Sequence, residues 1–217
     1  MPKVNEIFYS IQGEGIYQGL PMVFVRLQGC NLECTWCDTK YAQNPTEGTE
    51  LDVYTIIKEV EKYLQEGGFV CITGGEPLAQ GSSLMLLVAE LKAKGYRIEI
   101  ETNGSLKVPV WWDRVDSWSV DIKCPSSGEA NSFKSTWLNL RNVDQLKLVV
   151  SNEKDLEYVA ELTGKLCKVK PVIFVSPVIN GRIDLDWINE VVEFCKDYKL
   201  LLSLQWHKLI WGNKRGV

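Results

Sequence analysis

The sequence is poor in histidine and has no long apolar run. His207 is its only histidine among 217 residues, and no apolar run approaches the roughly 20 residues that span a membrane. Residues 1–6 lack the charged-then-apolar pattern of a secretory signal. Internal repeats and low-complexity segments are also missing. We therefore expect one domain, residues 1–217, that is cytoplasmic and has no membrane partner.

Excess positive charge is absent as well. The formal net charge is −4, which argues against non-specific binding to nucleic acid, so we expect no nucleic-acid partner. Hydrophobic residues make up 45% of the chain and charged residues 24%, as in an ordinary globular protein. A chain of this length can bury the core of one α/β domain.

Three cysteines, Cys30, Cys34 and Cys37, have the spacing C-x3-C-x2-C. No fourth cysteine stands close enough to complete a local set. Cysteine thiolates hold iron–sulfur clusters, and a four-iron cluster normally has one thiolate for each iron. Three ligands would leave one iron open to bind a small molecule, as catalytic zinc sites keep an open position. The spacing therefore favours a [4Fe-4S] cluster with an open iron.

The spacing alone leaves other interpretations of these cysteines open. A zinc knuckle usually takes two separated pairs of ligands, and His207 is far away in sequence. A disulfide is disfavoured because the chain has seven cysteines and no secretory signal. Buried thiols without a ligand are the last alternative. We expect that state for the four scattered cysteines, Cys71, Cys124, Cys167 and Cys195.

Apolar strands alternate with helical segments along most of the chain. Helices are expected over 53–65 with Asp52 as N-cap, 82–94, 153–163 with Ser151 as N-cap, and 184–196. Strands are expected over 22–28, 69–73, 97–101, 117–121, 145–150, 172–175 and 200–203. Repeated strand–helix units imply a parallel sheet with right-handed crossovers. The predicted fold class is α/β, a partial, open TIM-like barrel, because about six parallel strands are too few for a closed barrel of eight.

Unusual polar or glycine-rich segments follow these strands. In such folds ligands bind at the carboxyl ends of the strands. Chance would not place the segments in this way, so we expect one site along this edge of the sheet. The segments are the cysteine loop, 74–77, 101–104, 121–123, 176–177 and 205–207.

Two further features each admit two interpretations. Segment 10–15 is either a simple turn or a loop in which Gly13 and Gly15 let the backbone approach a ligand. Arg26 interrupts the apolar run 22–28. Because an unpaired buried charge is costly, Arg26 either forms a structural ion pair or binds an anion such as a carboxylate, to which it can donate two parallel hydrogen bonds.

The cysteine spacing, taken with Gly-Gly-Glu-Pro at 74–77, resembles the radical S-adenosylmethionine (SAM) enzymes. The resemblance implies that Cys30, Cys34 and Cys37 hold a [4Fe-4S] cluster. It also implies that the open iron binds the amino and carboxylate groups of SAM, and that 74–77 contacts its methionine part. The two motifs together are far more specific than either alone.

A narrower resemblance covers nearly the whole chain. The sequence is similar to the 7-carboxy-7-deazaguanine synthase family at S-I-Q-G-E-G (10–15), F-V-R-L-Q-G-C-N-L (24–32), W-C-D-T (36–39), E-T-N-G (101–104) and L-Q-W-H-K (204–208). That family rearranges 6-carboxy-5,6,7,8-tetrahydropterin into 7-carboxy-7-deazaguanine with loss of ammonia. The step belongs to the biosynthesis of queuosine and related 7-deazapurines.

The resemblance also implies roles for individual residues. Thr39 would ligate Mg2+, which prefers oxygen ligands, and Arg26 would bind the carboxylate of the pterin. Segment 209–217 matches no pattern, and Asn213 is the candidate contact within it. SAM would be contacted by Trp36, Cys37, Asp38, Gly74, Gly75, Glu76, Glu101, Asn103, Asp121, Lys123 and Ser176. The pterin would be contacted by Ile11, Gln12, Gly13, Glu14, Arg26, Thr73, Gln205, His207 and Asn213.

The implied chemistry belongs mainly to the cofactor. An electron from a flavodoxin-like or ferredoxin-like donor would cleave SAM, and a 5′-deoxyadenosyl radical would remove hydrogen from C6 of the pterin. SAM would be recovered after ring contraction. We expect no catalytic protein nucleophile, and the family implies a homodimer. The sequence names neither the physiological electron donor nor the downstream 7-deazapurine.

Two rival functions are weighed against this one. A glycyl-radical-enzyme activating enzyme shares the cysteine spacing, but it acts on a protein loop and would not need Arg26 or segment 12–14. A non-catalytic iron–sulfur electron carrier needs a closed cluster with four ligands and no SAM loop. Segment 74–77 argues against that second alternative.

Overall fold

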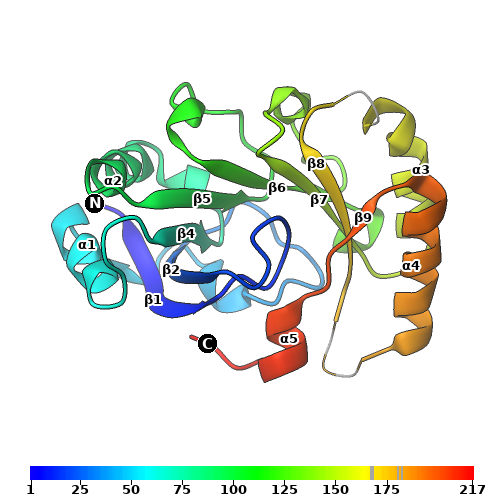
Figure 1. The fold of residues 1–217 in the computed structure, drawn as a ribbon, viewed down its shortest axis with the longest axis horizontal. Helices are drawn as coiled ribbons and strands as arrows, with labels where there is room; N and C mark the ends of the chain where they lie inside the picture. The colour runs from blue at the N-terminus through cyan, green and yellow to red at the C-terminus, as the bar shows by residue number, and fades with distance from the viewer. Residues whose placement is uncertain (167–168, 180, 182) are drawn as a thin grey trace.

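A nine-stranded sheet forms the framework of the described residues, which are 1–166, 169–179, 181 and 183–217 of this computed structural model. The sheet curves around an interior (Figure 1). Its strand order is β3-β1-β2-β4-β5-β6-β7-β8-β9. The strands are β1 (Lys3–Ile11), β2 (Pro21–Leu27), β3 (Thr49–Glu50), β4 (Phe69–Gly74), β5 (Arg97–Thr102), β6 (Ser117–Lys123), β7 (Gln145–Val150), β8 (Val172–Pro177) and β9 (Leu201–Leu202).

The strands from β2 to β9 in this order, seven in all, run parallel. The predicted α/β class with an open, barrel-like sheet is confirmed. The edge formed by β1 and β3 was not expected to extend the sheet. β1 pairs antiparallel with β2, and β3 pairs antiparallel with β1. A hairpin can join antiparallel strands through a short loop, so this edge needs no crossover helix.

Among the described residues, four helices connect parallel strands on the outer face, and a fifth follows the last strand, β9. They are α1 (Val53–Glu61), α2 (Ser82–Ala93), α3 (Glu153–Leu166), α4 (Leu185–Tyr198) and α5 (Trp206–Trp211). Contacts join α2 to β5, α3 to β7 and α4 to β8, and α1 and α2 flank the opposite end of the sheet from α3 and α4 (Figure 1). The first four were expected, with slightly different ends. The fifth is too short to show a helical period in the sequence.

The helix starts test two expected caps. Asp52 caps α1 as expected, because its Oδ1 accepts a hydrogen bond from the Thr55 amide at 2.8 Å. Ser151 as the cap of α3 is wrong. The side chain of Asn152 accepts from the Asp155 amide at 3.2 Å, while the amide of Ser151 donates to the Asp155 carboxylate. Asn caps a helix as well as Ser does, and here it stands one residue closer to the first turn.

The two faces of the sheet differ in chemistry. On β5, Ile98 and Ile100 belong to the apolar core beneath the helices, whereas Glu99 and Glu101 lie on the opposite, inner face, because side chains alternate along a strand. Lys147 occupies an inner position on β7 in the same way. The curved sheet therefore encloses a polar interior beneath an apolar outer layer.

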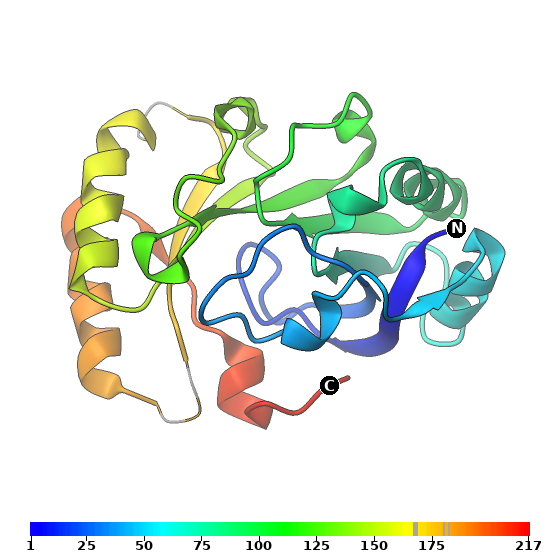
Figure 2. The ribbon, with the colours of Figure 1, turned by 180° about the vertical axis from the view of Figure 1, so that it is seen from behind.

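Two segments close this interior from opposite ends. The antiparallel partner of Ile11 is Pro21, the first residue of β2, so the loop 12–20 lies at the amino-terminal edge of the parallel strands. The cysteine loop follows the carboxyl end of β2. Seen from behind, the segment between β2 and α1 crosses the open side of the sheet, and the tail after α5 runs toward β1 (Figure 2).

Two further expectations concern the scattered cysteines and the lack of a membrane-spanning segment. Cys71, Cys124 and Cys195 are buried free thiols, as expected. Cys167 lies outside the described residues. Among the described helices, none has the length and apolar character that crossing a membrane requires.

Candidate active site

A cavity of about 470 Å³ lies inside the curved sheet. Its wall combines residues from the cysteine loop, the inner faces of the strands, the loop 12–20 and the tail after α5. It gathers most of the residues expected from the sequence, and Glu76 and Ser176 are the two that do not line it. The expected residues on the wall are Ile11, Gln12, Gly13, Glu14, Arg26, Cys30, Cys34, Trp36, Cys37, Asp38, Thr39, Thr73, Gly74, Gly75, Glu101, Asn103, Asp121, Lys123, Gln205, His207 and Asn213.

The three cysteines of the loop share one wall of this cavity as free thiols. Asn103 Nδ2 lies 3.7 Å from Cys30 Sγ. Burial raises the pKa of the Cys34 thiol to about 11, although Lys123 opposes the shift. Three neighbouring thiols without a fourth cysteine on the described wall fit the donor set of an open iron–sulfur cluster, as expected from the sequence. Binding would deprotonate these thiols and thus release protons.

The segment that follows β6 holds the cysteine loop by hydrogen bonds. Thr35 donates its amide to the Ser127 carbonyl at 3.0 Å, and the indole nitrogen of Trp36 donates to Ser126 Oγ at 2.9 Å. Ser126 is itself held by Asp155, through its amide at 2.9 Å and its hydroxyl at 2.5 Å. These bonds fix the orientation of Trp36 beside the thiols.

The Gly-Gly-Glu-Pro segment has a structural role at the end of β4. A Cβ atom at Gly75 would lie 2.4 Å from the Gly29 carbonyl oxygen, so only glycine lets these two backbone segments approach each other so closely. Glu76 is fully buried and accepts from Thr102 Oγ1 at 2.8 Å and from the Asn103 amide at 2.7 Å. This carboxylate thereby holds the end of β5 against the segment and positions Asn103 near Cys30.

Three further expected SAM contacts outside the cysteine loop differ in position. Asp121 and Lys123 line the cavity and form an ion pair of 2.6 Å. Lys123 Nζ also lies 5.6 Å from the centre of the Trp36 ring. Ser176 is fully buried, and its hydroxyl has no hydrogen-bond partner in the part of the chain that the structure describes.

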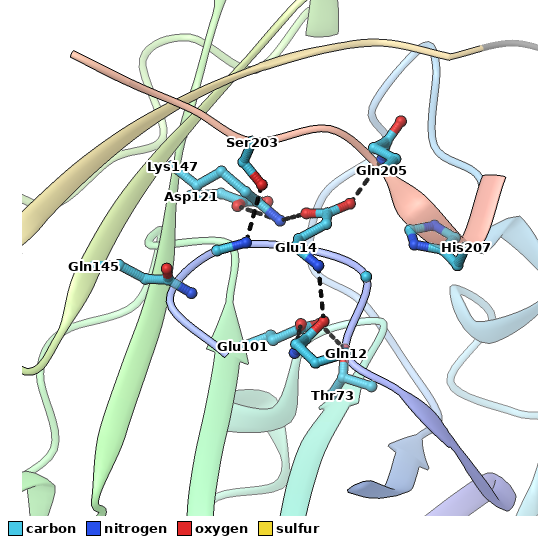
Figure 3. Close-up of polar contacts among 12 residues, drawn as sticks. Gln12, Glu14, Thr73, Glu101, Asp121, Gln145, Lys147, Ser203, Gln205 and His207 are labelled. Atoms are coloured by element: carbon cyan, nitrogen blue, oxygen red, sulfur yellow. Dashed lines mark hydrogen bonds and ion pairs between the residues drawn. The ribbon is translucent and has the colours of Figure 1, made fainter. Parts of the chain in front are cut away.

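The loop 12–20 forms the floor of the cavity and is held by the segment 203–206 (Figure 3). The Gly15 amide donates to Ser203 Oγ at 2.9 Å. Gln205 Nε2 donates to Glu14 Oε1 at 2.8 Å, and the Trp206 amide donates to the Gly13 carbonyl at 3.1 Å. The segment 10–15 is therefore more than a turn between two strands.

A buried ion network joins this floor to the wall that carries the expected SAM contact Asp121. Lys147 forms a close ion pair with Glu14 and lies 3.4 Å from Asp121 Oδ1 (Figure 3). Burial would raise the pKa of Glu14, but Lys147 and His207 hold it below its ordinary value. Burial would lower the pKa of Lys147, but Asp121 and Glu14 hold it well above its ordinary value. Burial would raise the pKa of Asp121 too, but Lys123 and Lys147 hold it below its ordinary value, so all three groups are charged at neutral pH.

Arg26 combines the two roles considered for it. Its Nε forms an ion pair with Glu6 Oε1 at 2.8 Å, so the structural ion pair considered for it is confirmed. The reason is that β1 pairs with β2 and places Glu6 opposite Arg26. The two terminal nitrogens of Arg26 have no hydrogen-bond partner among the described residues, and Arg26 lines the cavity. They remain available to an anion.

The tail after α5 packs against the same wall. The Arg215 guanidinium lies 3.6 Å from the centre of the Tyr41 ring, and its terminal nitrogen donates to Asn5 Oδ1 at 2.9 Å. Tyr41 in turn donates its hydroxyl to Glu6 at 3.1 Å. Asn213 lines the cavity. The tail thus covers the part of the cavity next to Arg26.

A second ionic group connects the cysteine loop to α5. Asp38 lies 3.0 Å from Lys208 Nζ and 4.0 Å from His207 Nε2. Burial would raise the pKa of Asp38, but His207 and Lys208 hold it well below its ordinary value. Thr39 Oγ1 donates to Asp38 Oδ1 at 3.3 Å. Two oxygen-bearing side chains therefore stand together at the position expected for Mg2+.

Sequence reasoning missed several residues of this site. Lys147 lies in the apolar strand 145–150, where a lysine at a buried position was itself a signal of function. Glu99 lies behind Glu101 on β5, and its partners come from three other segments. Arg215 lies in a stretch without a recognisable pattern. For these residues the direction of the side chain had to be known before their chemistry could be assigned.

Comparisons with known proteins agree with this geometry. A family model described as "Radical SAM superfamily" matches residues 24–127. The chain is 41% identical to a 7-carboxy-7-deazaguanine synthase of Koribacter versatilis, covering 96% of each chain. It is also 41% identical to one of Clostridium acetobutylicum, covering 99% of each. The crystal structure of QueE from Escherichia coli superposes with a TM-score of 0.72 at 27% identity, covering 95% of this chain and 94% of that one.

Proposed function

Because the chain belongs to the 7-carboxy-7-deazaguanine synthase family of radical SAM enzymes, we propose that it converts 6-carboxy-5,6,7,8-tetrahydropterin into 7-carboxy-7-deazaguanine and ammonia. It is a radical SAM lyase of 7-deazapurine biosynthesis. The observation that carries the proposal is the single cavity that joins the cysteine loop to the loop 12–20. Neither an activating enzyme nor an electron carrier needs the second of these loops.

The residues present fit the implied cofactor. Cys30, Cys34 and Cys37 would hold a [4Fe-4S] cluster, and the wall formed by Trp36, Asp121 and the other expected SAM contacts would hold SAM beside it. When bound, the two together supply the radical that starts the reaction in this class of enzyme. The chain's own task is to bind, orient and exclude water.

The carboxylate of the pterin would bind the two free terminal nitrogens of Arg26. Guanidinium and carboxylate match in geometry and charge. Burial acts to lower the pKa of Arg26, but Tyr41 and Glu6 raise it above its ordinary value, so Arg26 stays charged. The loop 12–20, called the floor loop from here on, would position the ring system of the pterin through its backbone and through the Glu14 side chain. The tail near Arg215 would cover this end of the substrate and keep water out.

Mg2+ is proposed to bind at Thr39 Oγ1, with the substrate supplying further oxygen ligands. A hydroxyl is a suitable ligand because Mg2+ prefers oxygen and keeps several waters. Thr39→Val keeps the shape of the side chain but removes the oxygen. It should weaken the stimulation of turnover by added Mg2+, whereas SAM binding should stay unchanged. Equal stimulation in both proteins would contradict the assignment.

The proposal includes the expected partners and location. A flavodoxin-like or ferredoxin-like protein would deliver the electron in the cytoplasm, and the enzyme would act as a homodimer. Sedimentation equilibrium at micromolar protein concentration tests the last point directly. A monomer mass over the whole concentration range would contradict it.

One anaerobic reaction tests the function. It contains reconstituted protein, a reductant, SAM, Mg2+ and 6-carboxy-5,6,7,8-tetrahydropterin, and mass spectrometry identifies the products. We expect 7-carboxy-7-deazaguanine. Cleavage of SAM without this product would keep the radical chemistry but contradict the substrate. If SAM stayed intact in protein with a full cluster, the enzyme assignment itself would be wrong.

A further inference from the structure

Two carboxylates and a thiol meet beneath the cavity floor. They belong to Glu99, Glu101 and Cys71, and one ligand atom from each lies within 4.8 Å of the other two. Glu99 and Cys71 are fully buried, whereas Glu101 lines the cavity. The cluster connects the inner faces of β4 and β5 to the place where the pterin is proposed to bind.

Only neutral groups hold these carboxylates. Gln12 Nε2 donates to Glu99 Oε2 at 2.6 Å and to Glu101 Oε1 at 3.0 Å. Gln145 Nε2 donates to Glu99 at 3.3 Å, and Thr73 Oγ1 donates to Glu101 Oε2 at 2.8 Å (the Gln12, Thr73 and Glu101 side chains are drawn in Figure 3). Among the described residues, no lysine or arginine nitrogen forms a salt bridge with Glu99 or Glu101.

The nearby cations are already engaged. Lys147 is bound to Glu14 and Asp121, and Arg26 is bound to Glu6. Two ionised carboxylates this close in a buried site repel each other strongly, and such pairs usually keep one proton between them. A single amide nitrogen that bridges both oxygens cannot neutralise two charges.

We propose that Glu99 and Glu101 share one proton in the working enzyme, with Glu99 as the neutral member and Glu101 as the ionised member that faces the cavity. Glu99 is then a positioning residue. Its proton lets Gln12 bridge the two side chains and keeps the floor loop in its binding position. The role for substrate binding rests on the proposed function, whereas the shared proton does not.

The titration properties of the cluster support this assignment. Burial, and then the neighbouring Glu101, raise the pKa of Glu99 to about 8, while Gln12 and Lys147 oppose the shift. The neighbouring thiol, phenol and ammonium groups do not lose or gain a proton near this pH. Burial raises the pKa of Cys71 well above its ordinary value of 9.0 and that of Tyr17, on the floor loop, above 10.0, and Lys147 stays charged. Glu99 is therefore the group that loses its proton near pH 8.

A bound metal ion is the alternative occupant of such a cluster. Gln12 argues against it, because its amide nitrogen lies between the two carboxylates where a cation would have to lie. The shared proton needs no rearrangement of these side chains.

The test compares pterin binding in wild type and Glu99→Gln. Anaerobic calorimetry measures the dissociation constant of 6-carboxy-5,6,7,8-tetrahydropterin from about pH 6 to pH 10, in cluster-loaded protein without SAM. The ratio of the two constants cancels the ionisation of the ligand itself. In wild type the constant should rise about tenfold per pH unit above about pH 8 relative to the variant, because binding requires the proton. Cys71→Ala should retain this dependence.

A second measurement needs neither substrate nor cofactor. Infrared difference spectra between neutral and alkaline pH should show the carbonyl band of a protonated carboxylic acid disappearing in wild type, with no such change in Glu99→Gln. A constant ratio of dissociation constants, or the same band change in the variant, would overturn the proposal. If wild type bound no pterin at any pH but showed the band, the shared proton would stand and the proposed substrate would be wrong.

Discussion

Cys34 is the most deeply placed of the three cysteines that face the cavity. Its thiol lies beside Lys123, whose charge favours the thiolate that a cluster requires. Cys34→Ala should therefore lose the visible absorbance of the cluster after reconstitution, and with it all turnover. Cys195→Ala is the matched control, since it removes a buried thiol on α4 and should keep the absorbance. Full activity of Cys34→Ala would contradict the cluster assignment.

Arg26 offers a second test at the level of one side chain. Arg26→Ala should weaken pterin binding by roughly 10- to 100-fold, because a hydrogen-bonded charge pair contributes about 1.5–3 kcal/mol. The cluster absorbance should be unaffected. Arg97→Ala, which removes an arginine from the outer start of β5, should bind as wild type does. Isothermal titration calorimetry measures both. Unchanged pterin affinity in Arg26→Ala would contradict the assignment of Arg26 to the carboxylate of the pterin.

Glu99 should also make stability depend on pH. Its pKa is raised in the folded protein from an ordinary value of 4.5 to about 8, so between these two values the folded state holds a proton that the unfolded state has lost. The free energy of unfolding should therefore fall as the pH rises from about 4.5 to about 8, and then level off. Urea titrations across this range should show a smaller decline in Glu99→Gln. An identical decline in both proteins would argue against a proton on Glu99.

Single residues also mark the limit of what the sequence reveals. Cys30, Cys34, Cys37 and Arg26 could be predicted because their chemistry is unusual in its context. Lys147 and Glu99 could not be assigned, because a charged residue in a strand acquires its role only from the face on which it lies and the partners that it meets there.

At the scale of elements, the floor loop depends on a close approach at Gly13. A Cβ atom there would lie 2.4 Å from His207 Nδ1, so Gly13→Ala should push the start of α5 away from the loop. A misplacement of about 1 Å in a site can cost a factor of roughly 100 in kcat/KM. We expect a loss of this order with the cluster retained.

Gly164→Ala provides the control for this substitution. Gly164 lies in α3, and a Cβ atom there would meet nothing within 4 Å. Alanine should stabilise the helix by about 0.5–1 kcal/mol and leave kcat/KM unchanged. If Gly13→Ala retained full kcat/KM, the contact between the floor loop and α5 would have no functional importance.

The elements show why one half of the site was easier to predict. Every segment that follows a parallel strand lies at the same edge of the sheet, so the cysteine loop, 74–77 and 101–104 could be placed together from their order alone. The floor loop follows β1, and its place depends on β1 being antiparallel to β2. The sequence contains no sign of that direction.

At the scale of the whole molecule, ligands of the folded state should stabilise it. The cysteines come together only in the folded chain, so reconstitution of the cluster should raise the melting temperature, by roughly 2–4 °C for each kcal/mol of binding. Anaerobic calorimetry of apo and reconstituted protein measures the shift. Cys34→Ala should show none. An equal shift in that variant would mean that iron and sulfide stabilise the protein at another place.

The hydrogen bonds between the floor loop and the segment 203–206 have a consequence for the synthesis of the protein itself. Gly15 and Ser203 are 188 residues apart in sequence, and Glu14 and Gln205 are 191 apart. Contacts of such separation form late in folding, because a long stretch of chain must be ordered first. A ribosome-bound chain can expose its cysteine loop early, but the floor has no support until residue 206 has left the exit tunnel. On the proposed function, the loop that holds the cluster would thus be complete before the substrate pocket, and cluster insertion would precede the ability to bind a pterin.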